Sequence, residues 1–205
     1  MPLPRLDFHI YNEAVVGHKG NSATIRKQPV CFSTGDERLQ HQIRSALCRL
    51  PPISGAPIVV DRAPGLRDRR GAVHAGAFLR QRRISLNCTA GEFLRIFVHE
   101  LFHFAWLRAG NSPRRSFEHL LRAEHRSGAA GELGWSAEWR KLALTPADRR
   151  TRSRRWREYC CESFCDTAAW LYSGAAAHPE FTLSPRFRRA RRGWFATFVK
   201  PRLSI

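Results

Sequence analysis

The residues His99, Glu100 and His103 form the pattern H-E-x-x-H, which constrains this chain more than any other feature of its sequence. The pattern lies within 91–109, a run that is apolar around most of the circumference of a helix, so we expect a buried helix there. Residues four positions apart share one helical face, so both imidazoles can bind a single metal ion. The alternative is a pair of histidines satisfied by hydrogen bonds alone. Polar groups buried without a partner are costly, and we therefore predict a zinc site.

The polar residues of this helix recur at steps of three or four and form one stripe: Glu92, Arg95, His99 and His103. A buried helix with a single polar stripe is expected to face a cleft. Thr89 and Glu92 have the spacing of a capping box, which predicts that the helix begins at this point.

Glu100 follows the first histidine and is expected to lie beside the open position of the metal. A zinc ion makes bound water more acidic, and a neighbouring carboxylate can take its proton. We therefore predict that Glu100 is the general base of a hydrolytic reaction and is not itself a ligand.

Two histidines leave the predicted site without a third ligand. The elongated metzincin pattern is excluded, because Trp106 and Ala109 occupy the positions of its glycine and third histidine, and Met1 is the only methionine. A second predicted helix, 154–173, carries three carboxylates at steps of four along one face: Glu158, Glu162 and Asp166.

The segment from Glu162 to Asp166 is E-x-x-x-D, and at this point the chain resembles the gluzincins, the thermolysin-like zinc peptidases. That clan carries H-E-x-x-H on one helix and E-x-x-x-D on a later one, and the chain resembles a compact member of bacterial type. By position, the resemblance implies that Glu162 is the third zinc ligand. It also implies that Asp166 orients His99 from the second coordination shell, as ligating histidines commonly require.

Other third ligands stay open from the residues alone. Glu158 can bind zinc with Glu162 behind it. His119 lies 16 residues after His103, as in the SprT-like proteases, whose third ligand is a histidine. Cys161 and Cys165 are four residues apart, and we interpret them as buried thiols beside the ligand helix.

A peptidase also needs a donor for the oxyanion of its tetrahedral intermediate. Three side chains near the second helix are candidates, and the sequence does not choose among them: Tyr159, Tyr172 and His178.

The fold class that we predict is α+β and zincin-like, with one catalytic domain over 1–205. An N-terminal lobe, 1–110, should hold a small mixed sheet and the H-E-x-x-H helix, and a mainly helical lobe, 111–205, should bring Glu162 across the cleft. An edge strand at 76–79 or 83–87 should lie beside the active helix and accept an extended peptide. The other expected elements are strands at 6–11, 57–61 and 72–79 and helices at 36–50, 112–125, 136–144 and 185–199.

The chain has 35 lysines and arginines against 17 acidic residues, a net charge of +18. Such a charge is typical of nucleic-acid binders, but only four of the cations are lysines and no recognition motif accompanies them. We predict a solvated basic surface with weak, non-specific affinity for nucleic acid, and a peptide or protein as the substrate. The alternatives are a nucleic-acid-associated, SprT-like protease and a non-catalytic protein that binds zinc or polyanions.

The sequence has no apolar run of about 18 residues, so no membrane-spanning helix is expected. The first 30 residues contain no apolar core of a signal peptide, and the six cysteines do not have the spacing of a small disulfide-rich domain. We therefore predict a cytoplasmic protein with reduced thiols.

Overall fold

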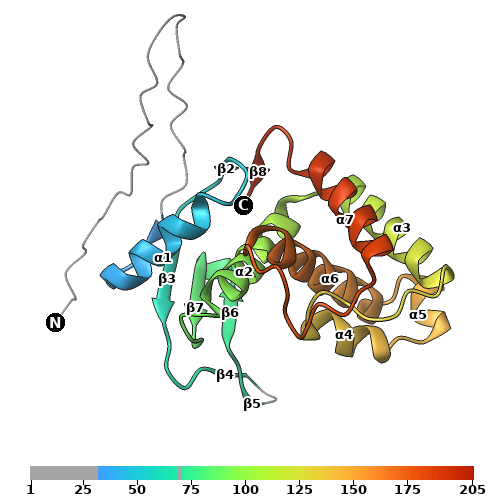
Figure 1. Ribbon diagram of the computed structural model, residues 1–205, viewed down its shortest axis with the longest axis horizontal. Helices are drawn as coiled ribbons and strands as arrows, with labels where there is room; N and C mark the ends of the chain where they lie inside the picture. The colour runs from blue at the N-terminus through green and yellow to red at the C-terminus, as the bar shows by residue number, and fades with distance from the viewer. Residues whose placement is uncertain (1–31, 69–70) are drawn as a thin grey trace, which may run out of the picture.

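The structure is a computed structural model that describes residues 32–68 and 71–205. These residues form a mixed α+β fold, which confirms the α+β part of the predicted class (Figure 1). The helices are α1 (Glu37–Leu47), α2 (Phe93–Arg108), α3 (Asn111–Arg126), α4 (Trp135–Leu142), α5 (Pro146–Thr151), α6 (Arg154–Tyr172) and α7 (Pro185–Phe198). The strand expected at 6–11 lies outside the described residues.

The strands are short, and they form one four-stranded sheet and two pairs. They are β1 (Phe32–Ser33), β2 (Ile53–Ser54), β3 (Ile58–Arg62), β4 (Arg67–Asp68), β5 (Gly71–Ala72), β6 (Ala75–Phe78), β7 (Arg83–Leu86) and β8 (Leu203–Ser204). The main sheet has the order β1-β3-β7-β6, and β2 pairs with β8 while β4 pairs with β5. A single-turn 3-10 helix, Leu79–Gln81, connects β6 to β7.

The main sheet is mixed, as predicted. Strands β1, β3 and β7 are parallel, and β6 runs antiparallel to β7 with Ala75 opposite Leu86. In β3 the side chains of Ile58 and Val60 are buried while Val59 is exposed, which is the alternation of a strand with one covered face. Strand β6 is therefore the edge strand near α2, whereas β7 lies inside the sheet.

Two helix starts differ from the sequence prediction. The capping box of Thr89 and Glu92 is wrong: α2 begins at Phe93, and its N-cap residue Glu92 makes no capping hydrogen bond. The Glu92 carboxylate instead binds Arg95 and His178, and these charged partners compete with the backbone amides of the first turn. The third helix begins at Asn111, because Gly110 with a φ of 70° turns the chain directly from α2 into α3.

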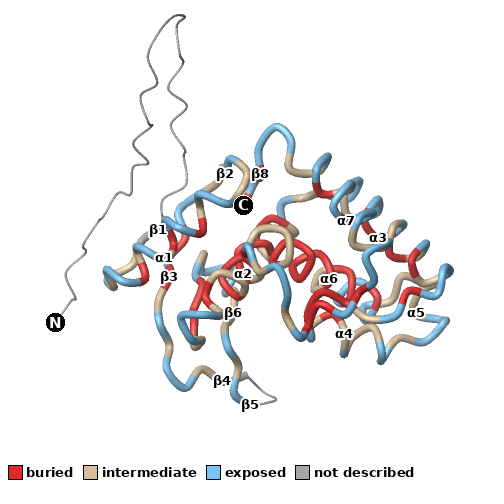
Figure 2. The backbone as a smooth tube through the Cα atoms, viewed as in Figure 1, coloured by how far each residue is buried: buried red, intermediate tan, exposed pale blue. Residues whose placement is uncertain are grey.

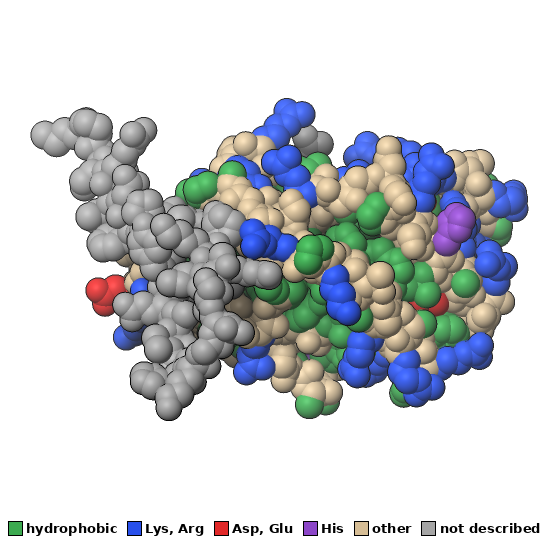
Figure 3. Space-filling model, turned by 90° about the horizontal axis from the view of Figure 1, so that it is seen from above, with side chains coloured by type: hydrophobic (Ala, Val, Ile, Leu, Met, Phe, Trp, Pro, Cys, Tyr) green, Lys and Arg blue, Asp and Glu red, His purple; other side chains and the backbone are tan. Residues whose placement is uncertain are grey.

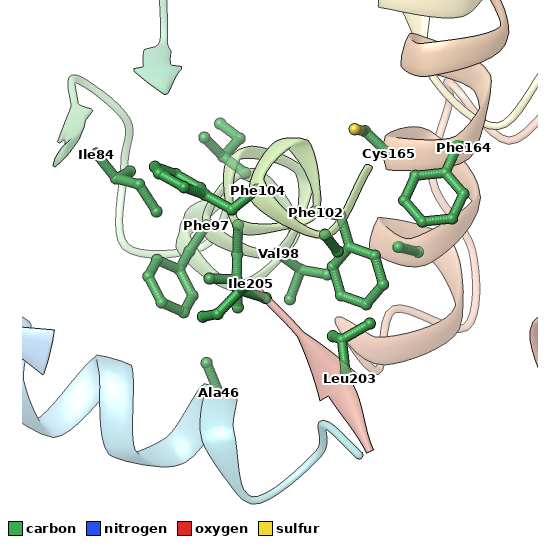
Figure 4. Packing of buried hydrophobic residues seen from close by; sticks show 14 of the residues in the cluster. Ala46, Ile84, Phe97, Val98, Phe102, Phe104, Phe164, Cys165, Leu203 and Ile205 are labelled. Carbon is green, nitrogen blue, oxygen red and sulfur yellow. The ribbon is translucent and has the colours of Figure 1, made fainter. Parts of the chain in front are cut away.

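Helices α2 and α6 lie at the centre of the described residues, where Figure 2 shows buried positions concentrated along both. In Figure 4 the apolar side chains of α2 point outward in several directions, toward the sheet, toward α1 and toward α6. One packed cluster includes Ile84 of β7, Ala46 of α1, Phe164 of α6 and the C-terminal Leu203 and Ile205. A helix covered on most sides can carry polar residues only on its remaining face.

The C-terminal residues return to the N-terminal part of the chain, where β8 pairs with β2 in parallel. The main hydrophobic cluster accordingly takes residues from both sides of position 110. The two-lobe division at that position stays a prediction. Within the described residues, every helix is too short or too polar to cross a lipid bilayer.

Candidate metal centre

The face of α2 that carries His99 and His103 lies beside α6. This contact brings the predicted ligand atoms together. Nε2 of His103 lies 3.2 Å from Nε2 of His99, which in turn lies 3.3 Å from Oε2 of Glu162. The i, i+4 spacing on α2 aligns the two rings, and Phe102 of α2 packs against Phe164 of α6 with ring centroids 5.8 Å apart. The helix contact thus positions two nitrogens and one carboxylate oxygen around one point.

Two of the three separations among these atoms are those expected around a zinc ion. Ligands that bind zinc tetrahedrally at about 2.0–2.1 Å lie about 3.3 Å from one another. The separations of 3.2 Å between His103 and His99 and 3.3 Å between His99 and Glu162 match this value, and all three atoms lie within 4.8 Å of one another. Two imidazoles and a carboxylate are also a common ligand set of zinc sites that keep a fourth position open.

Asp166 holds His99 from the far side of the ring. Its Oδ1 lies 2.7 Å from Nδ1 of His99, so Nε2 of that ring is directed toward Glu162. The other oxygen, Oδ2, accepts a hydrogen bond of 3.0 Å from the backbone N–H of Ala137 in α4. Asp166 is only 3% exposed, and both of its carboxylate oxygens are therefore held.

The start of α4 approaches Asp166 so closely that only glycine fits at position 134. A Cβ on Gly134 would lie 2.2 Å from Cγ of Asp166, far inside van der Waals contact. Gly134 and the amide of Ala137 thus fix the carboxylate that orients His99.

Glu100 is nearly buried and lines the cavity beside the two histidines. In the described part of the chain, no hydrogen bond or ion pair engages its carboxylate. This side chain differs in that respect from Glu162, which Arg140 contacts at 3.2 Å between Nη2 and Oε1. Glu100 is therefore an acidic side chain of α2 that lines the cavity without a partner among the described residues.

The charges around the centre favour a protonated histidine and an ionised carboxylate. Burial alone would lower the pKa of His99, but the Asp166 carboxylate and hydrogen bonds to Asp166 and Glu162 raise that pKa well above its usual value. Burial would raise the pKa of Glu162, but the hydrogen bond from His99 and the charges of His103, His99 and Arg140 lower it to about 2. A cation and an anion thus face each other where a divalent metal would bind two neutral imidazoles and an anion.

The three ligand residues line a cavity of about 440 Å³, which we call the central cavity. Residues of α2, α4, α6, the β5–β6 segment and the loop between α6 and α7 line it, including Arg95, Trp135, Trp139, Ala75, Gly76 and, from that loop, Glu180. Three of the four residues of the predicted polar stripe, Arg95, His99 and His103, line this cavity, whereas Glu92, which precedes α2, does not. Edge strand β6 forms one wall, as the sequence predicted for a strand beside the active helix.

A second group of potential ligands shares His103. Sγ of Cys161 lies 3.5 Å from Nδ1 of His103, and Cys165 completes a set whose ligand atoms lie within 4.8 Å of one another. Hydrogen bonds, first with Cys165 and then with His103, outweigh burial and lower the pKa of Cys161 to about 6. Neither cysteine lines the cavity. A substrate in the cavity would therefore not reach a metal ion bound by His103 and the two cysteines.

The other predicted candidates lie elsewhere. His119 is exposed on α3 and belongs to neither ligand group, and Glu158 is paired with Arg154 at 2.7 Å on the surface of α6. Tyr159 donates a 2.6 Å hydrogen bond to Oε1 of buried Glu132, and Tyr172 stacks on Phe102. His178 contacts Glu92, and none of these three oxyanion candidates is among the residues that line the cavity.

Sequence reasoning missed the contribution of α4. The amide of Ala137, the close approach of Gly134 and the ion pair of Arg140 all come from this helix. The sequence offered one signal, since Gly134 ends a small, flexible stretch directly before α4. The contact of Cys161 with His103 was also missed, although Cys161 precedes Glu162 in the chain.

Comparisons with protein-family models, with curated proteins and with solved structures found no match to this chain.

Proposed function

We propose that this protein is a zinc-dependent metallopeptidase of the gluzincin type, with a zincin-like fold. The observation that carries the proposal is the convergence of His99, His103 and Glu162 on one point of an open cavity, with Glu100 beside them. Asp166 behind His99 supports it further, because the second shell of zinc sites commonly has such a carboxylate.

In this proposal one zinc ion is held by His99, His103 and Glu162. When bound, the ion would lower the pKa of a coordinated water to about 7 and polarise a substrate carbonyl. The hydrogen bond with His99 and the charges of the two histidines and Arg140 keep Glu162 ionised, and Asp166 keeps Nε2 of His99 directed at the centre.

Glu100 takes a proton from the attacking water and passes it to the nitrogen of the leaving amine. Its carboxylate is suited to both steps, because it faces the cavity and is free of hydrogen bonds within the described residues. A substrate main chain can run along β6, whose outer edge pairs with no described strand and whose Ala75 and Gly76 line the cavity. Peptides and proteins are therefore the substrates that we propose.

The experiment compares wild type with Glu100→Ala on a mixture of unrelated peptides, with products identified by mass spectrometry. Wild type loaded with zinc should cleave peptide bonds. Glu100→Ala should keep its zinc and its circular dichroism spectrum but lose at least about a hundredfold in rate. Cleavage by Glu100→Ala at the wild-type rate would contradict the mechanism, and a zinc-loaded wild type that cleaves no peptide would contradict the proposed function.

A second candidate function is binding of a polyanion such as DNA, and one specific feature favours it. A cavity of about 550 Å³ between α3 and α5 is lined by Arg122, His125, Arg126, Pro146, Arg149 and Arg150. In Figure 3, however, the lysines and arginines of the described residues are spread over the face in view and do not gather at one place. This distribution supports a solvated basic surface with weak, non-specific nucleic-acid affinity.

We further propose a reducing, cytoplasmic location. The cysteines that the structure describes are all free thiols: Cys48, Cys88, Cys160, Cys161 and Cys165. Cys161 contacts His103, and Cys165 belongs to the same group of potential ligands. A reducing compartment keeps such thiols from oxidation.

A further inference from the structure

Helix α4 presents an apolar stripe that no described element covers. Among the residues that the structure describes, six large hydrophobic side chains are exposed, and three of them belong to this eight-residue helix. Trp135 is 52% exposed, Trp139 66% and Leu142 77%, at spacings of four and three that put them on one face. A concentration of exposed tryptophan and leucine of this kind marks a binding surface in proteins.

The stripe is continuous with the candidate metal centre. Trp135 and Trp139 line the central cavity, and Trp139 and Arg140 also line a second cavity of about 350 Å³. The second cavity extends from Arg140 past Ala143 to Arg155 on α6. We call this path, lined by Trp135, Trp139, Arg140, Ala143 and Arg155, the α4 groove.

The α4 groove carries surplus positive charge. Arg155 is exposed, and no hydrogen bond or ion pair in the described part of the chain engages its guanidinium. The carboxylate that also lines the second cavity, Glu158, is already paired with Arg154 at 2.7 Å. The groove therefore offers aromatic surface beside an unpaired cation.

The groove is tied rigidly to the centre through the inner side of α4. Ala137 is fully buried, and its N–H donates to Asp166. The N–H of Trp135 donates to Oε2 of Glu180, which also pairs with Arg95 of α2. A segment bound to the outer side chains of α4 is consequently held at a fixed position relative to His99.

We propose that the α4 groove docks an acidic segment of the substrate protein that carries a large apolar or aromatic side chain. The inference rests on the proposed peptidase function, and it names the substrate class of that same site. The apolar side chain packs on Trp135 and Trp139, and flanking glutamates or aspartates face Arg155. The docked segment continues into the central cavity along β6.

A peptide fits the α4 groove better than a nucleic acid. Tryptophan and arginine together can also stack bases and neutralise phosphates. The groove leads, however, into a cavity lined by Glu100, whose carboxylate is engaged by no described hydrogen bond or ion pair and would repel a continuous phosphate backbone. A peptide carries its charges on individual side chains and can place an uncharged main chain at that point.

The test measures binding separately from hydrolysis, in the Glu100→Gln background. The probe is a fluorescein-labelled peptide with several glutamates around a leucine-phenylalanine pair, and a second peptide has glutamine at each glutamate. Fluorescence anisotropy should show tighter binding of the acidic peptide. Trp139→Ala and Arg155→Glu should each weaken its binding about tenfold, the size expected for a central contact residue.

Two matched variants serve as controls. Leu107→Ala removes an apolar side chain of similar exposure from α2, and Arg189→Glu makes the same charge change on exposed α7. Both should bind the acidic peptide as tightly as the background protein does. The proposed docking role of the α4 groove would be overturned if the controls lost as much affinity for the acidic peptide, or if Trp139→Ala and Arg155→Glu lost none.

Two further outcomes separate this inference from the proposed function. Wild type that cleaves acidic and neutral peptides equally well, with no effect of Trp139→Ala on kcat/KM, would contradict the groove and leave the peptidase standing. Binding that depends on Trp139 and Arg155, without cleavage of any peptide by wild type, would support the groove and contradict the peptidase. A third outcome would overturn the inference. If the protein bound a labelled oligothymidine more tightly than the acidic peptide, and Trp139→Ala and Arg155→Glu weakened that binding, the groove would be assigned to single-stranded nucleic acid.

Discussion

Oδ1 of Asp166 lies 2.7 Å from Nδ1 of His99, so a buried carboxylate of α6 fixes the ring of a candidate ligand on α2. The remaining oxygen of Asp166 accepts the N–H of Ala137, so three helices meet at this one side chain. A histidine held in this way can present only Nε2 to a metal, and its affinity for that metal depends on the carboxylate behind it.

Asp166→Asn should therefore lower the zinc affinity of the protein about 10- to 100-fold while the fold is retained. The measurement is competition for zinc with a chromogenic chelator, together with circular dichroism. Glu158→Gln is the matched control, because it changes a carboxylate of the same helix that is paired only at the surface. Equal affinity of Asp166→Asn and wild type would show that the His99 contact does not support a metal.

Gly134→Ala should disturb the same carboxylate through the backbone of the loop before α4. The added Cβ would lie 2.2 Å from Cγ of Asp166, so either the loop or the carboxylate must move. We expect a loss of about 1–3 kcal/mol in the free energy of unfolding, measured in urea, and weaker zinc binding.

Gly193→Ala provides the comparison for this variant, because a Cβ at that position of α7 meets nothing within 4 Å. It should leave zinc binding unchanged and be neutral or stabilising by up to about 1 kcal/mol, as for glycine to alanine within a helix. Normal stability and zinc affinity in Gly134→Ala would mean that the close approach has no functional role.

A buried ion cluster away from the cavity predicts how stability depends on pH. Glu132 and Arg191 are both fully buried, with Nη1 and Oε2 2.7 Å apart. Burial would raise the pKa of Glu132, but the charge and hydrogen bonds of Arg191 lower it from 4.5 to about 2. A carboxyl whose pKa is lower in the folded than in the unfolded protein stabilises the fold above its unfolded pKa, and this stabilisation is lost as the pH falls toward its folded pKa.

The free energy of unfolding should therefore decrease by about 3 kcal/mol on account of Glu132 between about pH 5 and pH 2. Urea titrations at several pH values measure this change in the free energy of unfolding. The variant Glu132→Gln separates the contribution of Glu132 from that of other groups, such as Glu162, whose pKa is also lowered. The variant should be less stable than wild type at neutral pH and show a shallower pH dependence. Parallel curves for the two proteins would refute the assignment.

The net charge of +18 predicts a purely electrostatic interaction with DNA. Binding measured by fluorescence anisotropy should be alike for unrelated duplexes and single strands and should weaken steeply as salt rises to about 150 mM. Replacement of Arg149 and Arg150 by glutamate should weaken it, since both line the cationic cavity between α3 and α5. Tight binding of one sequence at that salt concentration would favour the nucleic-acid-associated protease instead.

The elements that carry the site could be predicted because their signals are local. The apolar run of α2 and the polar steps at His99 and His103 fix a helix and its open face within a few turns of chain. Helix α6 likewise showed its carboxylates at steps of four. The meeting of these two faces was predicted through the resemblance, and the distances of His99 to Glu162 and Asp166 agree with it.

What the sequence could not predict depends on residues that are distant in the chain. The amide of Ala137 reaches Asp166 across 29 positions, and Arg95 reaches Glu180 across 85. The capping box at Glu92 failed partly for this reason, because that carboxylate contacts His178, 86 positions away, as well as Arg95 in the first turn. A local sequence pattern contains no information on such tertiary partners, and these partners determine the hydrogen bonds at these positions.

The central claim is that one zinc ion is bound by His99, His103 and Glu162, and metal analysis of purified variants tests it most directly. The account predicts one zinc per chain in wild type and in Cys161→Ser, and loss of the metal in Glu162→Gln. Full zinc content in Glu162→Gln, with loss in Cys161→Ser or Cys165→Ser, would instead assign the metal to His103 and the two cysteines, on the side closed to the cavity. That result would contradict the proposed peptidase.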